Sequence, residues 1–194
     1  MFGLDGDELL HIGVSMVVVA VAFSVGALVQ SKDAFLATFP IILVGVGSGF
    51  VFHELAHKFV AQRYGAYARY QIWESGLALS LLMAVFTAGR FVFAAPGAVY
   101  IYSPRITRSQ NGIISIAGPL TNLAIGTLFL VSAPFASIGY LQTMAFSAAS
   151  INFFLGFFNM LPIPPLDGSK VFAWNFAAWA VLIILLAIPT FFLF

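Results

Sequence analysis

The sequence predicts an all-α polytopic membrane protein: a bundle of five to six transmembrane helices with a membrane-embedded re-entrant β-hairpin. Two observations support this fold class. Hydrophobic residues make up 61% of the 194 residues and charged residues only 8%, whereas a soluble domain usually carries about 25% charged residues. Several apolar stretches are also long enough to cross a hydrocarbon core of about 30 Å as helices. We therefore expect a single domain over residues 1–194, surrounded by a lipid bilayer.

Five apolar stretches are predicted to span the bilayer, at about residues 11–30, 38–64, 111–135, 139–161 and 170–193. The first could be mistaken for a signal peptide. However, Asp5, Asp7 and Glu8 precede it, where a signal peptide carries Lys or Arg. We expect it to be retained as a span. The fourth has the required length but contains Asn152 and Asn159.

Residues 76–102 form a different kind of segment. The run 77–88 is apolar but too short to span, and Gly89-Arg90 interrupts it. The run 91–102 is rich in aromatic and β-branched residues around Pro96-Gly97, a composition typical of strands. Two such runs favour a re-entrant β-hairpin over about 76–102, with a single helix over about 77–96 as the alternative. A strand edge exposed in a cavity would offer an extended peptide a surface for pairing.

Basic residues are distributed unevenly if this segment re-enters. Six would then share the side of the amino terminus: Arg63, Arg69, Arg90, Arg105, Arg108 and Lys170. Lys32 would lie on the opposite side. The positive-inside rule makes the crowded side cytoplasmic, so we expect a multi-pass protein of the cell membrane with a cytoplasmic amino terminus. A net charge of +1 without a basic cluster argues against a nucleic acid partner.

The run His53-Glu54-Leu55-Ala56-His57 lies near the inner end of the second predicted span. Two imidazoles four residues apart share one face of a helix, where both can bind one Zn²⁺. Glu54 projects beside them and can act as a general base on a water. Because a His-Glu pair is costly to place in hydrocarbon, it marks a functional site there by default.

A catalytic zinc needs three protein ligands and an open position. The chain has no cysteine, so the third ligand must be another kind of residue. The acidic residues at outer or terminal edges are Asp5, Asp7, Glu8 and Asp33. Glu74 follows a series of interfacial aromatic residues and is expected to be solvated. Elimination leaves Asp167, which follows three prolines and precedes Gly168 at an irregular point of the backbone. Its alternative role is to cap the last helix beside Lys170.

Together these motifs resemble those of the site-2 proteases, a family of intramembrane zinc metalloproteases, in its minimal prokaryotic type without PDZ or CBS domain. The run 53–57 corresponds to the family's HExxH motif, and the run 159–168 to its Asn…Pro…Leu-Asp-Gly motif. The sequence Gly118-Pro119-Leu120-Thr121-Asn122 corresponds to a third element, which opens a central span. The resemblance covers about residues 10–170.

The resemblance implies one Zn²⁺ per chain, bound by His53, His57 and Asp167, with Glu54 as the base. It also implies that Asn159 lies near the metal, where its amide could steady the substrate or the developing oxyanion. A helix cap is the alternative role for Asn159.

For substrate binding, the resemblance implies two groups of residues. Asn122 would bind the substrate backbone, with an interhelical hydrogen bond as its alternative role. The second group resembles the membrane-embedded strand region that receives substrate in this family, and consists of Pro96, Gly97, Ala98, Val99 and Tyr100.

The implied activity is hydrolysis of peptide bonds within or near the transmembrane segment of a membrane-protein substrate, with the active site toward the cytoplasmic side. Two other functions stay open. A CaaX-type membrane endopeptidase usually takes a Glu ligand from a later helix, but the only later acidic residue here is Asp167. A metal transporter or sensor tends to line a route with several ligating groups, whereas this sequence shows a single constellation.

Overall fold

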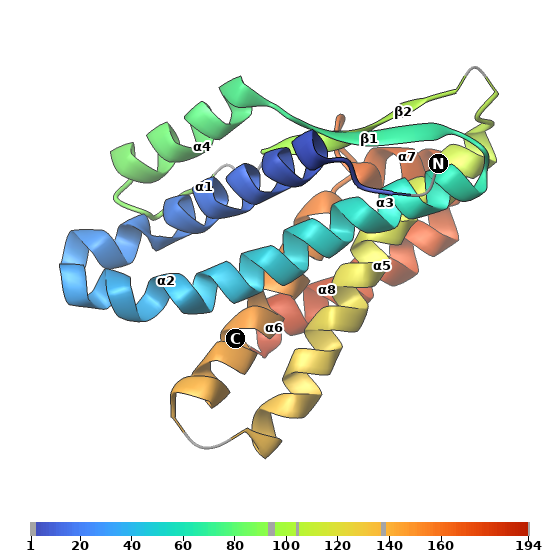
Figure 1. Cartoon of the computed structure of the whole chain (residues 1–194). Helices are drawn as coiled ribbons and strands as arrows, with labels where there is room; N and C mark the ends of the chain where they lie inside the picture. The colour runs from blue at the N-terminus through green and yellow to red at the C-terminus, as the bar shows by residue number, and fades with distance from the viewer. Residues whose placement is uncertain (1–2, 93–95, 104, 137–138, 194) are drawn as a thin grey trace.

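The computed structural model of the protein describes residues 3–92, 96–103, 105–136 and 139–193. The described chain is mostly helical and carries one two-stranded antiparallel sheet (Figure 1). In chain order its elements are α1 (Gly6–Gln30), α2 (Lys32–Val46), the π-helix η1 (Gly47–Val51), α3 (Phe52–Arg63), β1 (Tyr67–Ile72), α4 (Glu74–Phe86), β2 (Gly97–Tyr102), α5 (Arg108–Ser132), the 3-10 helix η2 (Ala133–Phe135), α6 (Tyr140–Asn159), α7 (Asp167–Trp174) and α8 (Phe176–Phe192).

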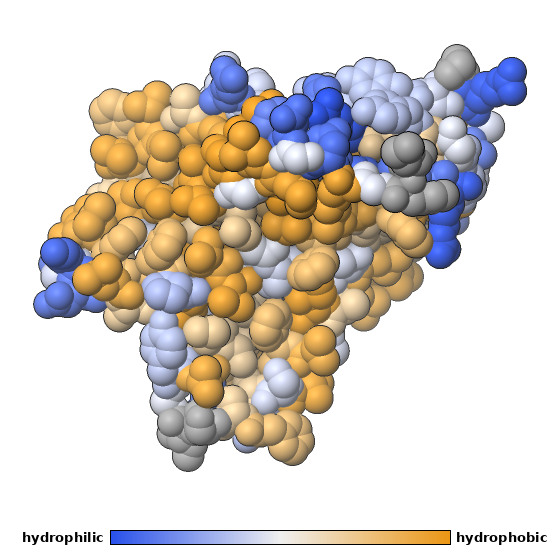
Figure 2. Space-filling model, viewed as in Figure 1, coloured by the Kyte–Doolittle hydropathy of each residue, from blue (hydrophilic) through white to orange (hydrophobic). Residues whose placement is uncertain are grey.

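Among the described residues, four helical stretches are long and apolar enough to cross a membrane: Gly6–Gln30, Lys32–Arg63, Arg108–Phe135 and Tyr140–Asn159. They match the first four predicted spans. The second joins α2, η1 and α3 into one long rod (Figure 1). Figure 2 shows a broad apolar band over this face, with hydrophilic side chains gathered near the amino terminus and sheet and at the turn between α1 and α2.

The prediction of a single last span over 170–193 is wrong. Helix α7 ends before Asn175, whose backbone is extended at φ −150° and ψ 103°. The Asn175 side chain accepts a hydrogen bond from the backbone N–H of Ala178 at 3.1 Å, and so caps a separate helix, α8, of 17 residues. One Asn changes the mean hydropathy of the run very little, yet its side chain can replace a backbone partner and end a helix.

The predicted β-hairpin within 76–102 is wrong in its first arm, because residues 74–86 form α4. Leu, Ala and Met dominate that run and favour a helix. Strand β2 pairs with β1 instead, in a register that runs from Tyr67 opposite Tyr102 to Ile72 opposite Gly97. The backbone N–H of Trp73 donates to the Pro96 carbonyl at 2.9 Å, so the segment between them returns to the point where it left. The alternative helix over 77–96 is wrong too, since α4 ends at Phe86.

The turn after α4 places Arg90 at another end of the bundle than the sequence predicted. A Cβ added to Gly26 would lie 3.6 Å from the Ala88 carbonyl oxygen and 3.8 Å from the Gly89 Cα. Gly26 lies in the last turns of α1, so Arg90 lies toward the end of the bundle that is remote from the amino terminus. The prediction that placed Arg90 with the other basic residues was wrong, because it assumed that a short hairpin keeps its turn near the same surface.

A buried ion pair ties the amino terminus to α3 and β1, and we call it the N-terminal clamp. Lys58 Nζ lies 2.5 Å from Glu8 Oε2 and donates to the Gly3 carbonyl at 2.8 Å. Glu8 Oε1 accepts the backbone N–H of Tyr70 at 2.8 Å. At the surface beside it, Asp5 accepts from the N–H of Glu8 and from Arg69. These two contacts lower the pKa of the Asp5 carboxyl below its ordinary value. The clamp therefore places the sheet beside the His53–His57 turn of α3.

Candidate metal centre

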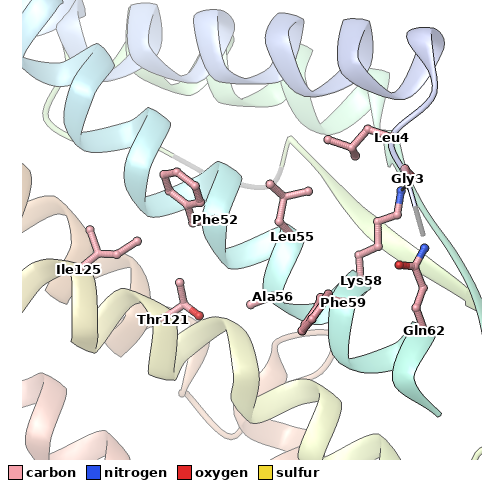
Figure 3. A pocket seen from close by; sticks show the side chains of 10 residues that line it. All are labelled: Gly3, Leu4, Phe52, Leu55, Ala56, Lys58, Phe59, Gln62, Thr121 and Ile125. Carbon is pink, nitrogen blue, oxygen red and sulfur yellow. Dashed lines mark hydrogen bonds between the residues drawn. The ribbon is translucent and has the colours of Figure 1, made fainter.

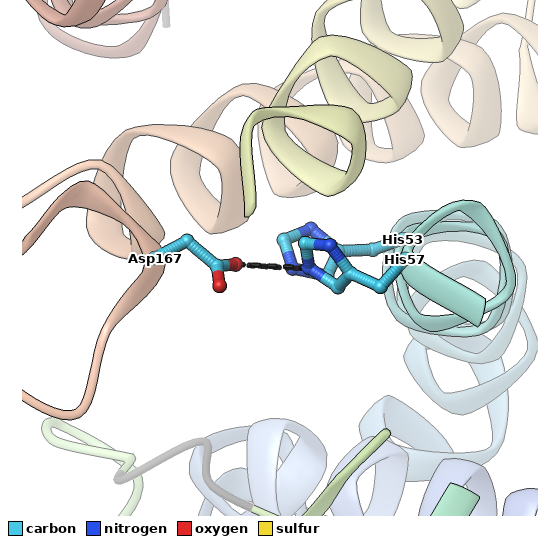
Figure 4. Close-up of side chains that lie close together, drawn as sticks. All are labelled: His53, His57 and Asp167. Carbon is cyan, nitrogen blue, oxygen red and sulfur yellow. Dashed lines mark hydrogen bonds and ion pairs between the residues drawn. The ribbon is translucent and has the colours of Figure 1, made fainter. Parts of the chain in front are cut away.

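His53 and His57 lie one turn apart on α3, and both imidazoles point to the same side of the helix (Figure 4). Their Nε2 atoms are 3.0 Å apart. The side chains are nearly inaccessible, with residue exposures of 4% and 7%. The helical period of 3.6 residues explains this shared direction, which the spacing in the sequence predicted.

Asp167 approaches the two imidazoles from the start of α7 (Figure 4). Its Oδ2 atom lies 3.1 Å from His53 Nε2 and 2.9 Å from His57 Nε2. One ligand atom from each of the three residues lies within 4.8 Å of the others. The structure therefore brings together the three predicted ligands. Lys170 lies 3.4 Å from the other oxygen, Oδ1, so this contact leaves Oδ2 directed at the histidines.

The remaining imidazole nitrogens show that these residues fit a metal ion. His53 Nδ1 lies 2.6 Å from Asn122 Oδ1, and His57 Nδ1 lies 2.7 Å from the Ile114 carbonyl oxygen. Each acceptor receives the proton of Nδ1, so in the neutral imidazoles the lone pair lies on Nε2, toward the Asp167 carboxylate. Three converging electron-pair donors repel one another unless a cation lies between them, and two His with one carboxylate are a common catalytic zinc set.

A cavity of about 410 Å³ opens beside these three side chains. Glu54 lines it, and its Oε2 accepts a hydrogen bond from the backbone N–H of Val99 at 3.0 Å. Asn159 lines it as well, and donates to the Leu155 carbonyl of its own helix at 3.0 Å. The predicted strand region also borders the cavity, from Pro96 and Gly97 through Ala98 and Val99 to Tyr100. The cavity therefore holds a potential base and a strand edge beside the candidate ligands.

Asn122 lies behind His53 rather than in the cavity. Its side chain is fully buried, and its Nδ2 donates to the Gly49 carbonyl at 2.7 Å while its Oδ1 faces His53. The predicted contact of Asn122 with a substrate backbone is therefore contradicted by this arrangement, because both ends of its amide are already used inside the protein. The alternative role as an interhelical hydrogen bonder describes its contacts.

Three contributors to the centre were not predicted. Asn152 accepts from Asn122 Nδ2 at 3.3 Å. Its presence in an apolar span was the only signal in the sequence. Gly118 packs against both imidazoles, and its place in the Gly-Pro-x-x-Asn motif was a signal without an assigned role. The Ile114 carbonyl holds His57, and no side-chain pattern could have revealed a backbone contact.

A second cavity, of about 430 Å³, lies on another face of α3 (Figure 3). Its lining is mostly apolar and includes Phe52, Leu55, Phe59 and Ile125. The Lys58 ammonium at its border is already paired with Glu8. The chemistry of the described residues is therefore concentrated in the cavity at His53, His57 and Asp167.

The protein resembles known peptidases over most of its length. The profile of peptidase family M50 matches residues 133–182. A candidate zinc metalloprotease of Methanocaldococcus jannaschii is 39% identical over 185 residues, which cover 93% of this chain and 91% of that protein. Rip2 of Mycobacterium tuberculosis is 28% identical over 180 residues, 81% of this chain and 65% of Rip2. YwhC of Bacillus subtilis is 29% identical over 154 residues, 70% of this chain and 69% of YwhC.

Rip2 and YwhC are also assigned as candidate zinc metalloproteases. No solved structure matches the chain. The 39% identity to the Methanocaldococcus jannaschii protein over nearly the whole length, together with the profile match, confirms the resemblance found in the motifs. The chain belongs to peptidase family M50, the site-2 protease family.

Proposed function

We propose that this protein is a zinc endopeptidase of the membrane that hydrolyses peptide bonds within or next to the transmembrane segment of a protein substrate, as in regulated intramembrane proteolysis. The observation that carries the proposal is the meeting of His53, His57 and Asp167 in one cavity with Glu54 and the edge of β2. Family membership and the zinc metalloprotease relatives support the same reaction class.

His53, His57 and Asp167 would hold one Zn²⁺ through Nε2, Nε2 and Oδ2. The chemistry that zinc would supply there is polarisation of the scissile carbonyl and activation of a water. Glu54 would accept the proton of that water and deliver it to the leaving amine. Asn159, on the cavity wall, would steady the substrate or the oxyanion with its amide.

The edge of β2 that faces away from β1 has backbone groups that an extended substrate could pair with. Tyr70 and Val99 lie opposite each other, yet their N–H groups donate outward, to Glu8 and to Glu54. This is the non-hydrogen-bonded type of pair, and the backbone groups of Gly97 and Ile101 point away from β1 in the same way. An unwound substrate segment would pair along this edge of β2. A substrate carbonyl at the Val99 N–H would then replace the Glu54 carboxylate and free the base.

A helical substrate must lose intrahelical hydrogen bonds before it can pair in this way. A transmembrane segment that contains Gly or Pro should therefore be cleaved faster than a poly-Leu segment of the same length. The test is incubation of the purified protein with both single-span substrates, with and without a chelator, and mass spectrometry of the fragments. Equal cleavage of the two segments would contradict the unwinding step.

Glu54→Gln tests the reaction class. This variant should keep its zinc and lose cleavage by about 10²–10⁴-fold, the usual contribution of a general base. A CaaX-type endopeptidase would instead cleave only substrates that carry a prenylated Cys close to the carboxyl terminus. A transporter would keep metal flux in Glu54→Gln, since Glu54 is not one of the three proposed ligands. Full flux with no proteolysis in the wild type would overturn the proposal.

We also propose that the active site lies toward the cytoplasmic side. The N-terminal clamp joins the amino terminus to Lys58, the residue after His57, so the site and the amino terminus share one end of the bundle. Arg69 lies at this end through its contact with Asp5. Lys170 lies there as well, beside Asp167. An excess of basic residues at one end favours the cytoplasmic side.

A further inference from the structure

The helical rod of α2, η1 and α3 carries His53 and His57, and it widens just before them. Residues 47–51 form the π-helix η1, in which the hydrogen-bond spacing changes from four residues to five. The Gly49 carbonyl in this turn accepts a hydrogen bond from Asn122 Nδ2 at 2.7 Å. A Cβ on Gly49 would lie 2.9 Å from Leu155 Cδ1 and 3.3 Å from Asn152 Oδ1. Because Gly49 has no side chain, Leu155 and Asn152 of α6 pack directly against the π-turn.

The Gly49 carbonyl determines which way the Asn122 amide points. A carbonyl oxygen accepts but cannot donate, so it must face the NH₂ end of the amide. The oxygen end then faces His53 Nδ1 at 2.6 Å. With the amide reversed, two oxygens would lie in contact in a fully buried place. His53 therefore carries a proton on Nδ1, and in the neutral imidazole this leaves the lone pair on Nε2, the atom that faces Asp167.

Asn152 supports the same orientation from α6. Its Nδ2 donates to the Ala148 carbonyl at 2.8 Å and to Ser48 Oγ at 3.0 Å. Both of its N–H groups are thereby used, and its Oδ1 accepts from Asn122 Nδ2 at 3.3 Å. Asn152 is fully buried. A continuous set of hydrogen bonds thus runs from α6 through Asn122 of α5 to His53 of α3.

We propose that Asn152 is a positioning residue of the metal centre, which acts through Asn122 on the tautomer and orientation of His53. The inference rests on the proposed role of His53 as a zinc ligand. Asn152 is too far along the chain of contacts to touch a substrate or a metal, because Asn122 stands between it and His53. Its effect should therefore appear in metal binding before it appears in the chemistry of peptide hydrolysis.

The experiment measures zinc affinity by chelator competition and the visible absorption of the Co²⁺-substituted protein, whose bands report ligand geometry. Partners behind a metal ligand are worth about 10–100-fold in affinity. We expect zinc affinity to fall about 100-fold in Asn122→Leu and about tenfold in Asn152→Leu, the two ends of that range. Both should also alter the Co²⁺ spectrum. Thr143→Val is the matched control on α6, since the Thr143 hydroxyl donates to the carbonyl of Gly139, the residue just before this helix, and touches none of the three residues Asn152, Asn122 and His53.

The double variant Asn122→Leu/Asn152→Leu distinguishes positioning from general stability. If Asn152 acts through Asn122, the double variant binds zinc no more weakly than Asn122→Leu alone. Losses that add, or an unchanged affinity and spectrum in Asn152→Leu, would overturn the inference. If Asn152→Leu does not fold, Asn152→Ser removes the same contact with less added bulk and is judged by the same results. A wild-type protein that binds no zinc would instead refute the proposed function.

Discussion

Gly118 shows how a missing side chain shapes the metal centre. A Cβ at this position would lie 2.5 Å from His57 Nε2 and 2.6 Å from His53 Nε2, well inside van der Waals contact. These two nitrogens are the atoms that face Asp167. Helix α5 therefore approaches the ligand atoms as closely as a backbone can, and the glycine leaves room for an ion between them.

Gly118→Ala should therefore weaken zinc binding by at least about tenfold, because the new methyl group must displace an imidazole or occupy the space of the ion. Zinc content after dialysis against a weak chelator measures this loss. Gly13→Ala is the control, since nothing lies within 4 Å of a Cβ added to that helical glycine. Full zinc retention in Gly118→Ala would show that the imidazoles do not need this space.

At the scale of elements, the N-terminal clamp connects three parts of the fold that lie far apart in the chain. Glu8 is 1% exposed and Lys58 is 5% exposed, so water solvates neither charge to a large extent. Glu8 binds Lys58 with one oxygen and the backbone of β1 with the other. The clamp thus links the start of α1, the ligand-bearing helix α3 and the sheet that borders the cavity.

Glu8→Gln should destabilise the protein by roughly 3–5 kcal/mol, because it leaves the Lys58 ammonium buried without a counter-charge. Thermal unfolding in detergent measures the change. Asp7→Asn serves as a control: Asp7 lies 3.5 Å from Arg69 with its side chain 85% exposed, and an exposed pair of this kind adds little to stability. Similar shifts in the two variants would mean that the buried pair adds nothing beyond a surface contact.

The molecule as a whole places its polar chemistry at one end of an apolar bundle. The candidate ligands, the sheet and the clamp lie at the end of the amino terminus, while α1 and α2 meet at the other end (Figure 1). Lys32 begins α2 at that remote end, and Arg105 follows β2 at the end of the sheet. A topology with a cytoplasmic active site therefore requires these two exposed residues to face opposite compartments.

Single-cysteine variants can test this arrangement, because the chain has no cysteine of its own. With a membrane-impermeant maleimide on sealed vesicles of known orientation, Arg105→Cys should react from the cytoplasmic side and Lys32→Cys from the opposite side. The unmodified protein should not react at all. Labelling of both variants from one side, or in the reverse order, would contradict the proposed orientation.

Much of the candidate site was predictable because it depends on short-range order. The turn of a helix brings His53 and His57 together, and their spacing in the sequence is enough to show it. Asp167 is 110 residues from His57. It could be found because few acidic residues exist in this chain and because the run 159–168 resembles a family motif. The first four spans follow from length and hydropathy in the same direct way.

The sequence by itself determined the four long apolar helices, the paired histidines with Glu54, and the identity of the distant carboxylate. Tertiary structure alone decided that β2 pairs with β1, that Asn175 divides the last apolar run, and that Asn122 stands behind His53. The physical reason is that a helical period or an apolar run acts within a few turns of one segment. The partner of a strand edge or of a buried amide depends on which remote segment packs against it.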